Sequence, residues 1–284
     1  WFESNLICTL SLICLCSFFL FILRELKTKN PIVDLRIFAN RNFLICTILV
    51  FIWGIIIFAT QYILPVFIAR TRGLDGTTIA SMVYIMGAAQ VASGFLALFL
   101  FKVVNRRTVA FIGFIMLATG TWLQGFMISE IGLNEIIWPQ IIRGLSAQLC
   151  FLPLVLLSIG YLPADKIKDG SGLYSLMNRL GAAIGIAASN TLFELKITEN
   201  YLEISNITSK VLYQSQLFLT KLNNLIPKYL SNSPEKIKIA SEILYKIGIE
   251  EASAMAFNQI MLIMGIMALV ISPLIFFVKG LKKE

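Results

Sequence analysis

Two arginines lie deep inside long apolar runs, and they are the residues of this chain best suited to binding or gating. Arg143 and Arg179 each stand well within such a run. A charged side chain inside a bilayer is costly, so it usually faces a cavity or a partner. The two arginines therefore indicate groups along a path through a membrane. The alternative is that they bond carbonyl groups and only hold helices together.

Polar residues accompany both arginines at helical spacing. Gln140, Arg143 and Ser146 share one arc of a helix. A second arc of about 120° contains Ser175, Asn178, Arg179, Ser189 and Asn190. Two such faces predict a wet central cavity. Further side chains that could hydrogen-bond a substrate, or equally a neighbouring helix, are Gln61, Tyr62, Gln90, Asn258 and Gln259.

Glycine and proline spacing predicts how these helices pack. Gly181 and Gly185 form a small-xxx-small pattern, which lets two helix backbones approach closely. Pro139 and Pro153 bracket a segment that we expect to bend. The glycines and Pro153 are therefore predicted to serve helix packing.

The titratable residues argue against an enzyme. Histidine is absent, which removes the usual general base, so any proton chemistry must use carboxylates. The acidic residues considered for this role stand in loops or near helix ends: Asp34, Asp75, Glu130, Glu135, Asp165, Asp169 and Glu194. The five cysteines show no metal-ligand spacing. We expect no catalytic residues, no metal and no cofactor. Either a proton-coupling residue lies outside this chain, or the protein does not couple to protons through this part.

Seven apolar segments must position these residues. The chain has 284 residues, of which 57% are hydrophobic and 14% charged, which excludes an ordinary soluble domain. Each segment reaches about the 20 residues that a membrane helix needs. The segments cover residues 6–23, 43–69, 77–101, 107–127, 136–161, 171–194 and 253–278. They are too long and uniformly apolar for barrel strands, so the sequence predicts an all-α integral membrane protein.

Basic residues predict the orientation. Loops 24–42, 102–107 and 162–170 and the C-terminal tail carry most of the flanking Lys and Arg, which places them in the cytoplasm. The same flanking explains the net charge of +8 without nucleic-acid binding. Residues 195–252 then form a long extracytoplasmic loop. Within it we expect two short surface helices, Ser209–Leu222 and Pro234–Ile249, although a disordered loop remains the alternative.

Two regions follow from this division. Residues 1–42 comprise a linker helix and a cytoplasmic amphipathic segment, Pro31–Asn42, and residues 43–284 comprise six further helices. Those six could divide into three plus three, the inverted-repeat plan of many secondary transporters. The chain begins at Trp1, and we expect it to be a fragment.

Several motifs resemble one transporter family. Residues 30–35 (NPIVDL), with Phe38 and residues 41–43 (RNF), resemble the segment before the ninth helix of EmrB/QacA-type fourteen-helix drug:proton antiporters of the major facilitator superfamily. Residues 138–140 (WPQ), Gly144 and Pro153 resemble its twelfth helix. Residues 171–173 (SGL) and 178–181 (NRLG), with Gly185, resemble the thirteenth. The resemblance implies the C-terminal six-helix half of such a transporter, preceded by a linker helix.

The resemblance also implies a function. Members export hydrophobic and amphipathic small molecules against an inward flow of protons, in the bacterial inner membrane. Those of the EmrB type work with a periplasmic adaptor and an outer-membrane channel. The family's proton-coupling motifs belong to the N-terminal half, so this chain is expected to need that half for transport. Alternatives are an exporter of a narrow substrate such as a siderophore or lipid, a non-transporting scaffold, or an inactive remnant.

Overall fold

All regular secondary structure in the described part of the chain is helical. The computed structural model describes residues 5–28, 34–73, 75–127, 133–222 and 234–279. Its α-helices are α1 (Asn5–Lys27), α2 (Arg41–Arg72), α3 (Gly76–Val103), α4 (Arg106–Gln124), α5 (Leu133–Ile159), α6 (Ile167–Leu222) and α7 (Pro234–Ile271). Short 3-10 helices are η1 (Leu35–Ala39), η2 (Ala164–Lys166) and η4 (Ser272–Phe277). The all-helical fold class and the helical character of the seven segments are confirmed.

Six of these helices are long and apolar enough to cross a membrane: α1, α2, α3, α5, α6 and α7. The seventh, α4, has 19 residues, or about 28 Å of helix at 1.5 Å per residue. It packs between α5 and α7, with nine of its residues buried. Its length is close to the bilayer core of about 30 Å.

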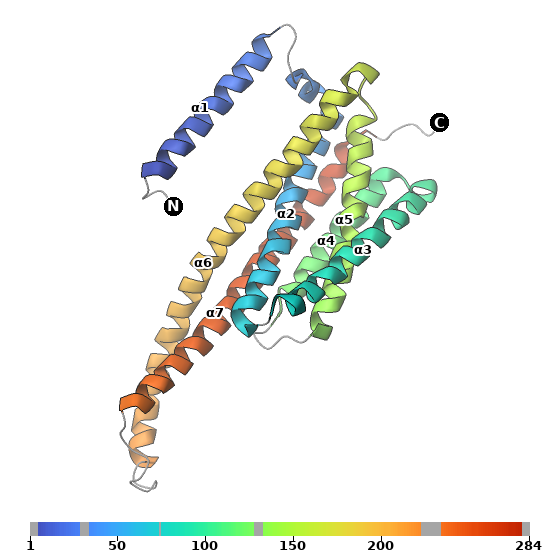
Figure 1. Ribbon diagram of the computed structural model, residues 1–284. Coiled ribbons are helices and arrows are strands. Elements are labelled where there is room, and N and C mark those ends of the chain that lie inside the picture. The colour runs from blue at the N-terminus through green and yellow to red at the C-terminus, as the bar shows by residue number, and fades with distance from the viewer. Residues whose placement is uncertain (1–4, 29–33, 74, 128–132, 223–233, 280–284) are drawn as a thin grey trace.

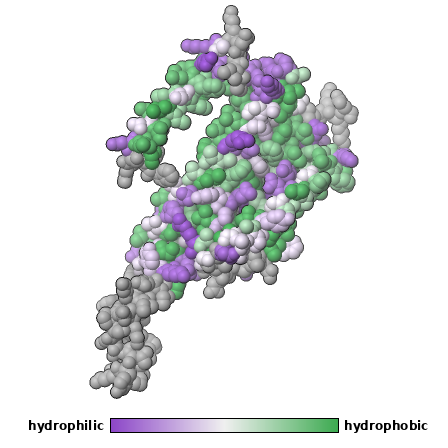
Figure 2. Space-filling model, in the orientation of Figure 1, coloured by the Kyte–Doolittle hydropathy of each residue, from purple (hydrophilic) through white to green (hydrophobic). Residues whose placement is uncertain are grey.

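Helices α2 to α7 form one bundle, and α1 stands apart from it (Figure 1). The main contact of α1 is with η1. None of its most apolar stretch is buried. Figure 2 shows hydrophobic residues over much of the visible face of α1 and of the bundle, with hydrophilic residues interspersed. Such a surface suits a lipid environment.

The pairing of helices is crossed. Helix α2 runs along α6, and α3 runs along α5, whereas α2 and α3 barely touch each other. Helices α4 and α7 contact each other as well as α5 and α2 respectively. If α2–α4 and α5–α7 are two related triplets, the first helix of each triplet packs along the second helix of the other. This is the pattern that an inverted three-plus-three repeat produces.

Glycines allow these pairs to pack with almost no space between their backbones. A Cβ atom at Gly181 would collide with the carbonyl oxygen of Phe51, and one at Gly185 would lie 2.5 Å from that of Ile55. On the other side of the seam, a Cβ at Gly54 would lie 2.8 Å from the carbonyl oxygen of Asn178. The sequence prediction that Gly181 and Gly185 serve close packing is confirmed.

Charged residues at both ends limit the apolar part of the bundle. On α6, Asp169 and Glu194 stand 25 positions apart, which corresponds to about 38 Å of helix. On α2, Arg41 and Arg70 play the same part. These distances fit a bilayer core of about 30 Å with its headgroup regions.

Helices α6 and α7 differ from the sequence prediction because they continue past this charged level. The two short surface helices expected within 195–252 are instead the ends of α6, with 56 residues, and α7, with 38. No glycine or proline interrupts residues 186–222, so nothing ends the helix there. From Pro234, the first residue described after this stretch, the chain is already helical, as predicted for Pro234–Ile249. Residues 223–233 lie outside the described residues.

The segment before α2 is held against the bundle rather than lying free. Asp34 accepts a hydrogen bond from the backbone N–H of Arg36 at the start of η1, and its carboxylate lies 3.0 Å from Nζ of Lys166. Ile37 is buried against Phe43. Thus the expected amphipathic segment contains the 3-10 helix η1, which packs beside α2 and α6, and ends in the first residues of α2; its residues 31–33 lie outside the described residues.

The Asp34–Lys166 pair generates a pH prediction. The Lys166 ammonium, through its hydrogen bond, holds the pKa of Asp34 below its usual range. Asp34→Asn keeps the acceptor for Arg36 and removes only the charge. The pair's contribution is complete above the unfolded-state pKa of about 3.9 and is lost as pH falls through the lower folded-state value. The wild type should therefore be more stable than Asp34→Asn at pH 7, by about 1 kcal/mol or less. The difference should shrink as the pH is lowered below about 4, and a difference that does not change with pH contradicts the assignment.

The glycine seam generates a second prediction. Gly181→Ala should lower stability by about 1–3 kcal/mol, because the new methyl group overpacks a backbone contact. Gly172→Ala on the same helix is the matched control, since nothing lies within 4 Å of its Cβ position. Thermal melting in detergent should separate the two variants, with Gly172→Ala at or above the wild type. Equal melting of both variants contradicts a tight α2–α6 seam.

Candidate transport site

Arg143 is completely enclosed by the bundle and joins three helices. Its Nη1 donates hydrogen bonds to Oε1 of Gln124 at 2.7 Å and to Oε1 of Gln140 at 3.1 Å. Its Nη2 donates to the hydroxyl of Thr60. The guanidinium therefore ties α5 to α4 and α2. All four side chains are buried.

The acceptors around Arg143 are neutral. None of the ion pairs among the described residues includes this arginine, and its Nε has no partner. Gln124 donates to Gln140 at 3.3 Å, and Gln140 donates to the carbonyl of Met82 on α3 at 3.5 Å. The cluster of Thr60, Gln124, Gln140 and Arg143, called the Arg143 cluster below, thus reaches four helices.

The sequence missed half of this cluster. Arg143 and Gln140 were chosen as cavity or gating residues, whereas Gln124 and Thr60 were not. Gly120 was a further available signal, because it lies four residues before Gln124 in an apolar helix. A Cβ there would lie 2.6 Å from Cγ of Arg143, so the glycine makes room for the arginine stem. In the described chain a substrate could reach Arg143 only if α2, α4 and α5 moved apart.

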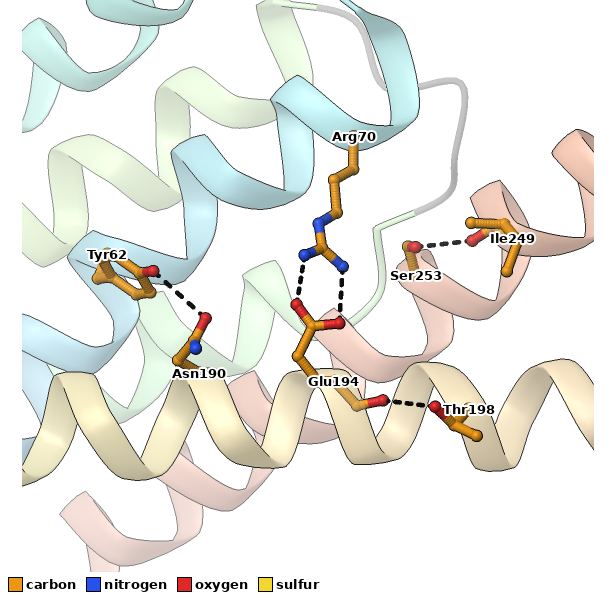
Figure 3. Close-up of polar contacts among 7 residues, drawn as sticks. All are labelled: Tyr62, Arg70, Asn190, Glu194, Thr198, Ile249 and Ser253. Atoms are coloured by element: carbon orange, nitrogen blue, oxygen red, sulfur yellow. Dashed lines mark hydrogen bonds and ion pairs between the residues drawn. The ribbon is translucent and has the colours of Figure 1, made fainter. Parts of the chain in front are cut away.

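A second set of polar contacts follows the seam between α2 and α6. The hydroxyl of Tyr62 donates to Oδ1 of Asn190 at 3.3 Å, and Arg70 forms a two-pronged ion pair with Glu194 (Figure 3). The guanidinium of Arg70 also lies 5.6 Å from the ring centre of Phe193. These contacts hold the two helices together toward the end of the bundle away from Asp169. They confirm that Asn190 lies on the polar side of α6 but give it a partner within the chain.

Arg179 is a charged residue of α6 that the other described helices do not cover. Its side chain is exposed and forms no hydrogen bond or ion pair within the described residues. Along α6 it stands ten positions from Asp169 and fifteen from Glu194, about 15 and 22 Å of helix respectively. It is therefore well within the apolar span, on a face that this chain does not cover. Ser175, one turn away, is exposed as well.

The remaining predicted residues divide between open and packed positions. Gln61 on α2 and Gln90 on α3 are half-buried and form no side-chain hydrogen bond within the described part of the chain. Asn178 is half-buried, and its Oδ1 has no partner. Pro153 is buried within α5, which remains helical through it. A cavity or gating role for Gln61, Gln90 and Asn178 stays a prediction, as does the helix-packing role of Pro153.

Asn258 has a structural role within the chain. Its Oδ1 accepts from the backbone N–H of Met127 at 3.1 Å, and its Nδ2 donates to the carbonyl of Met127 at 2.7 Å. This double contact ties the end of the α4 region to α7. The neighbouring Gln259 donates to Asn200 at 3.4 Å.

Carboxylates are absent from the middle of the described spans of α2 to α7. Their acidic residues stand at or beyond the ends, as Asp169, Glu194 and Glu250 illustrate. Within the described residues, no three His, Cys, Asp or Glu side chains form a group that could hold a metal ion.

The two arginines should respond differently to truncation. Arg143→Ala leaves buried acceptors without a donor and opens a cavity, so stability should fall by about 3 kcal/mol or more. Arg179→Ala removes an exposed side chain and should stay within about 0.5 kcal/mol of the wild type. Thermal melting of both purified variants measures this. A stable Arg143→Ala variant would show that the Arg143 cluster does not hold the bundle together.

Comparisons with known proteins place this arrangement in a family. The Major Facilitator Superfamily model matches residues 6–186. The colistin resistance protein EmrB of Acinetobacter baumannii is 26% identical over the whole chain, which covers 55% of that protein. The multidrug export protein EmrB of Escherichia coli is 25% identical over 79% of the chain and 44% of its own length.

A third relative is the fatty acid resistance protein FarB of Neisseria gonorrhoeae, which is 27% identical over 68% of the chain and 38% of its own length. The chain thus spans about half the length of these curated relatives. The family model covers more than half of the chain and agrees with a bundle of membrane-crossing helices. The chain therefore belongs to the Major Facilitator Superfamily.

Proposed function

We propose that this chain is one half of an exporter that removes hydrophobic and amphipathic compounds from the cell in exchange for protons. The observation that carries the proposal is Arg179, an exposed arginine in the middle of an apolar span with no partner within the described residues. A charge at that depth is too costly to face lipid. It therefore faces water or another part of the transporter, as a residue beside a transport path would.

The relatives support the class of substrate. The chain is related to multidrug export proteins, and two of its relatives are named for resistance to colistin and to fatty acids. These are amphipathic compounds of opposite charge. A predominantly apolar path with few fixed polar groups would accept such a range.

Proton coupling depends on a carboxylate in this proposal. The described spans of α2 to α7 offer none in their interior, and histidine is absent. The proton-binding carboxylate is accordingly assigned to the other half of the transporter. No cofactor is needed, because the proton gradient supplies the energy. Alternating access would come from rocking of the two halves about the path between them.

The cellular setting is part of the same proposal. Helices that cross a membrane several times and the related bacterial exporters support a multi-pass protein of the bacterial inner membrane. The side on which α6 and α7 extend past the charged level is proposed to be extracytoplasmic. A periplasmic adaptor and an outer-membrane channel would complete the export route.

Efflux of the fluorescent cation rhodamine 6G tests this function. Cells expressing the complete gene should export the dye faster than cells with an empty vector, and a protonophore should abolish the difference. Arg179→Ala should reduce efflux several-fold at unchanged membrane level, whereas Arg179→Lys keeps the charge and should retain more activity.

Two results would count against the proposal. Wild-type cells that export no dye would favour a narrow substrate over multidrug export. Unchanged efflux by Arg179→Ala would remove Arg179 from the transport path, and efflux that survives the protonophore would exclude proton coupling.

A further inference from the structure

Three buried polar atoms without partners lie on α2 and α6, in the part of the bundle where Phe151 of α5 contacts both helices. They are the indole Nε1 of Trp53, the hydroxyl of Tyr174 and the amide Oδ1 of Asn178. Trp53 is 5% exposed and Tyr174 is 2% exposed. Most buried polar groups in proteins form hydrogen bonds, so each exception needs a reason. Inside a membrane span the need is greater, because lipid offers no replacement partner.

Contacts with neighbouring side chains connect the three groups. The ring of Phe151 on α5 lies 5.2 Å from that of Trp53 and 5.9 Å from that of Tyr174, measured between centroids. Asn178 lies against Gly54, the neighbour of Trp53 in the chain. Tyr174 precedes Asn178 by four residues, so both lie on one face of α6. Two donors and an acceptor are therefore arranged around aromatic walls.

The seam between α5 and α6 is the weakest boundary of this cluster. Helix α6 packs mainly on α2 and α7, and α5 packs mainly on α3 and α4, with little contact between α5 and α6 themselves. The glycine contacts between α2 and α6 can stay closed while α5 moves away. Movement at this seam would expose Tyr174 and Phe151 without breaking the tight pairs.

We propose that Trp53, Tyr174 and Asn178 form a substrate subsite for flat aromatic amphiphiles that carry both a hydrogen-bond donor and an acceptor. The inference rests on the proposed export function and names the substrate chemistry that this half selects. The indole N–H donates to the ligand's acceptor, Oδ1 of Asn178 accepts from its donor, and the Tyr174 hydroxyl can do either. Phe151 and the two aromatic rings cover the ligand's flat face.

Binding of rhodamine 6G to the purified chain in lipid nanodiscs tests the subsite. This dye is a flat aromatic cation with N–H donors and an ester acceptor, and its fluorescence polarisation reports binding without transport. Tyr174→Phe keeps the ring and should weaken binding about three- to tenfold, the effect of one lost hydrogen bond. Tyr84→Phe on α3, whose side chain is 73% exposed, is the matched control and should bind like the wild type.

The specificity of the loss distinguishes a subsite from a packing role. Tetraphenylphosphonium is an aromatic cation with no hydrogen-bonding group, so its competition with the dye should reveal equal affinity for wild type and Tyr174→Phe. Because the hydroxyl has no partner in the free protein, Tyr174→Phe should melt at the same temperature as the wild type or higher.

Each contrary result overturns the subsite. If rhodamine 6G does not bind the wild type, these three groups do not form a subsite for such a ligand. Equal binding by Tyr174→Phe and Tyr84→Phe would remove the hydroxyl from recognition. Lower affinity for both cations together with a lower melting temperature would make Tyr174 a packing residue. Efflux by cells tests the export function separately, so failure of one is distinguishable from failure of the other.

Discussion

The absence of water in the bilayer core is the constraint on which this structure depends. A backbone or side-chain polar group there must find its partner within the protein. Helices satisfy the backbone, and the Arg143 cluster satisfies most of a buried charge by engaging Gln124, Gln140 and Thr60. The same constraint gives meaning to the polar groups that lack partners, namely Arg179 on an open face and Tyr174 inside the bundle.

The helices of the bundle are packed against one another with unequal tightness. Backbone contacts at Gly181 and Gly185 join α2 to α6, and Gly144 joins α5 to α3, where a Cβ would lie 2.5 Å from the carbonyl of Met86. The Arg143 cluster then connects the two pairs directly, from Arg143 on α5 to Thr60 on α2, and adds α4 through Gln124. The pairs α2–α6 and α3–α5 are tightly packed, whereas α5 and α6 have few contacts with each other. Each pair can therefore shift as a unit, which is the kind of motion that alternating access requires.

The sequence predicted features that depend on local composition and missed those that depend on tertiary partners. Helix spans and the roles of Gly181 and Gly185 follow from apolar runs and residue size. The acceptors of Arg143 come from helices distant in the chain, so no periodicity reveals Thr60. The continuation of α6 past Glu194 was also missed. A polar composition ends an apolar span, but it does not by itself end the helix. The described residues leave Arg179 exposed and Asn178 half-buried, so their role beside a transport path stays a prediction.

The central claim is that Arg179 lines an aqueous path rather than lipid, and cysteine labelling tests it most directly. In the complete transporter with the five native cysteines of this chain replaced by alanine, a cysteine at position 179 would be compared with one at Val270, which is 70% exposed on α7. A water-soluble maleimide should label position 179 and leave position 270 unlabelled, and rhodamine 6G should slow the reaction at 179. Absence of labelling at both positions would place Arg179 in lipid or a dry interface and contradict the account.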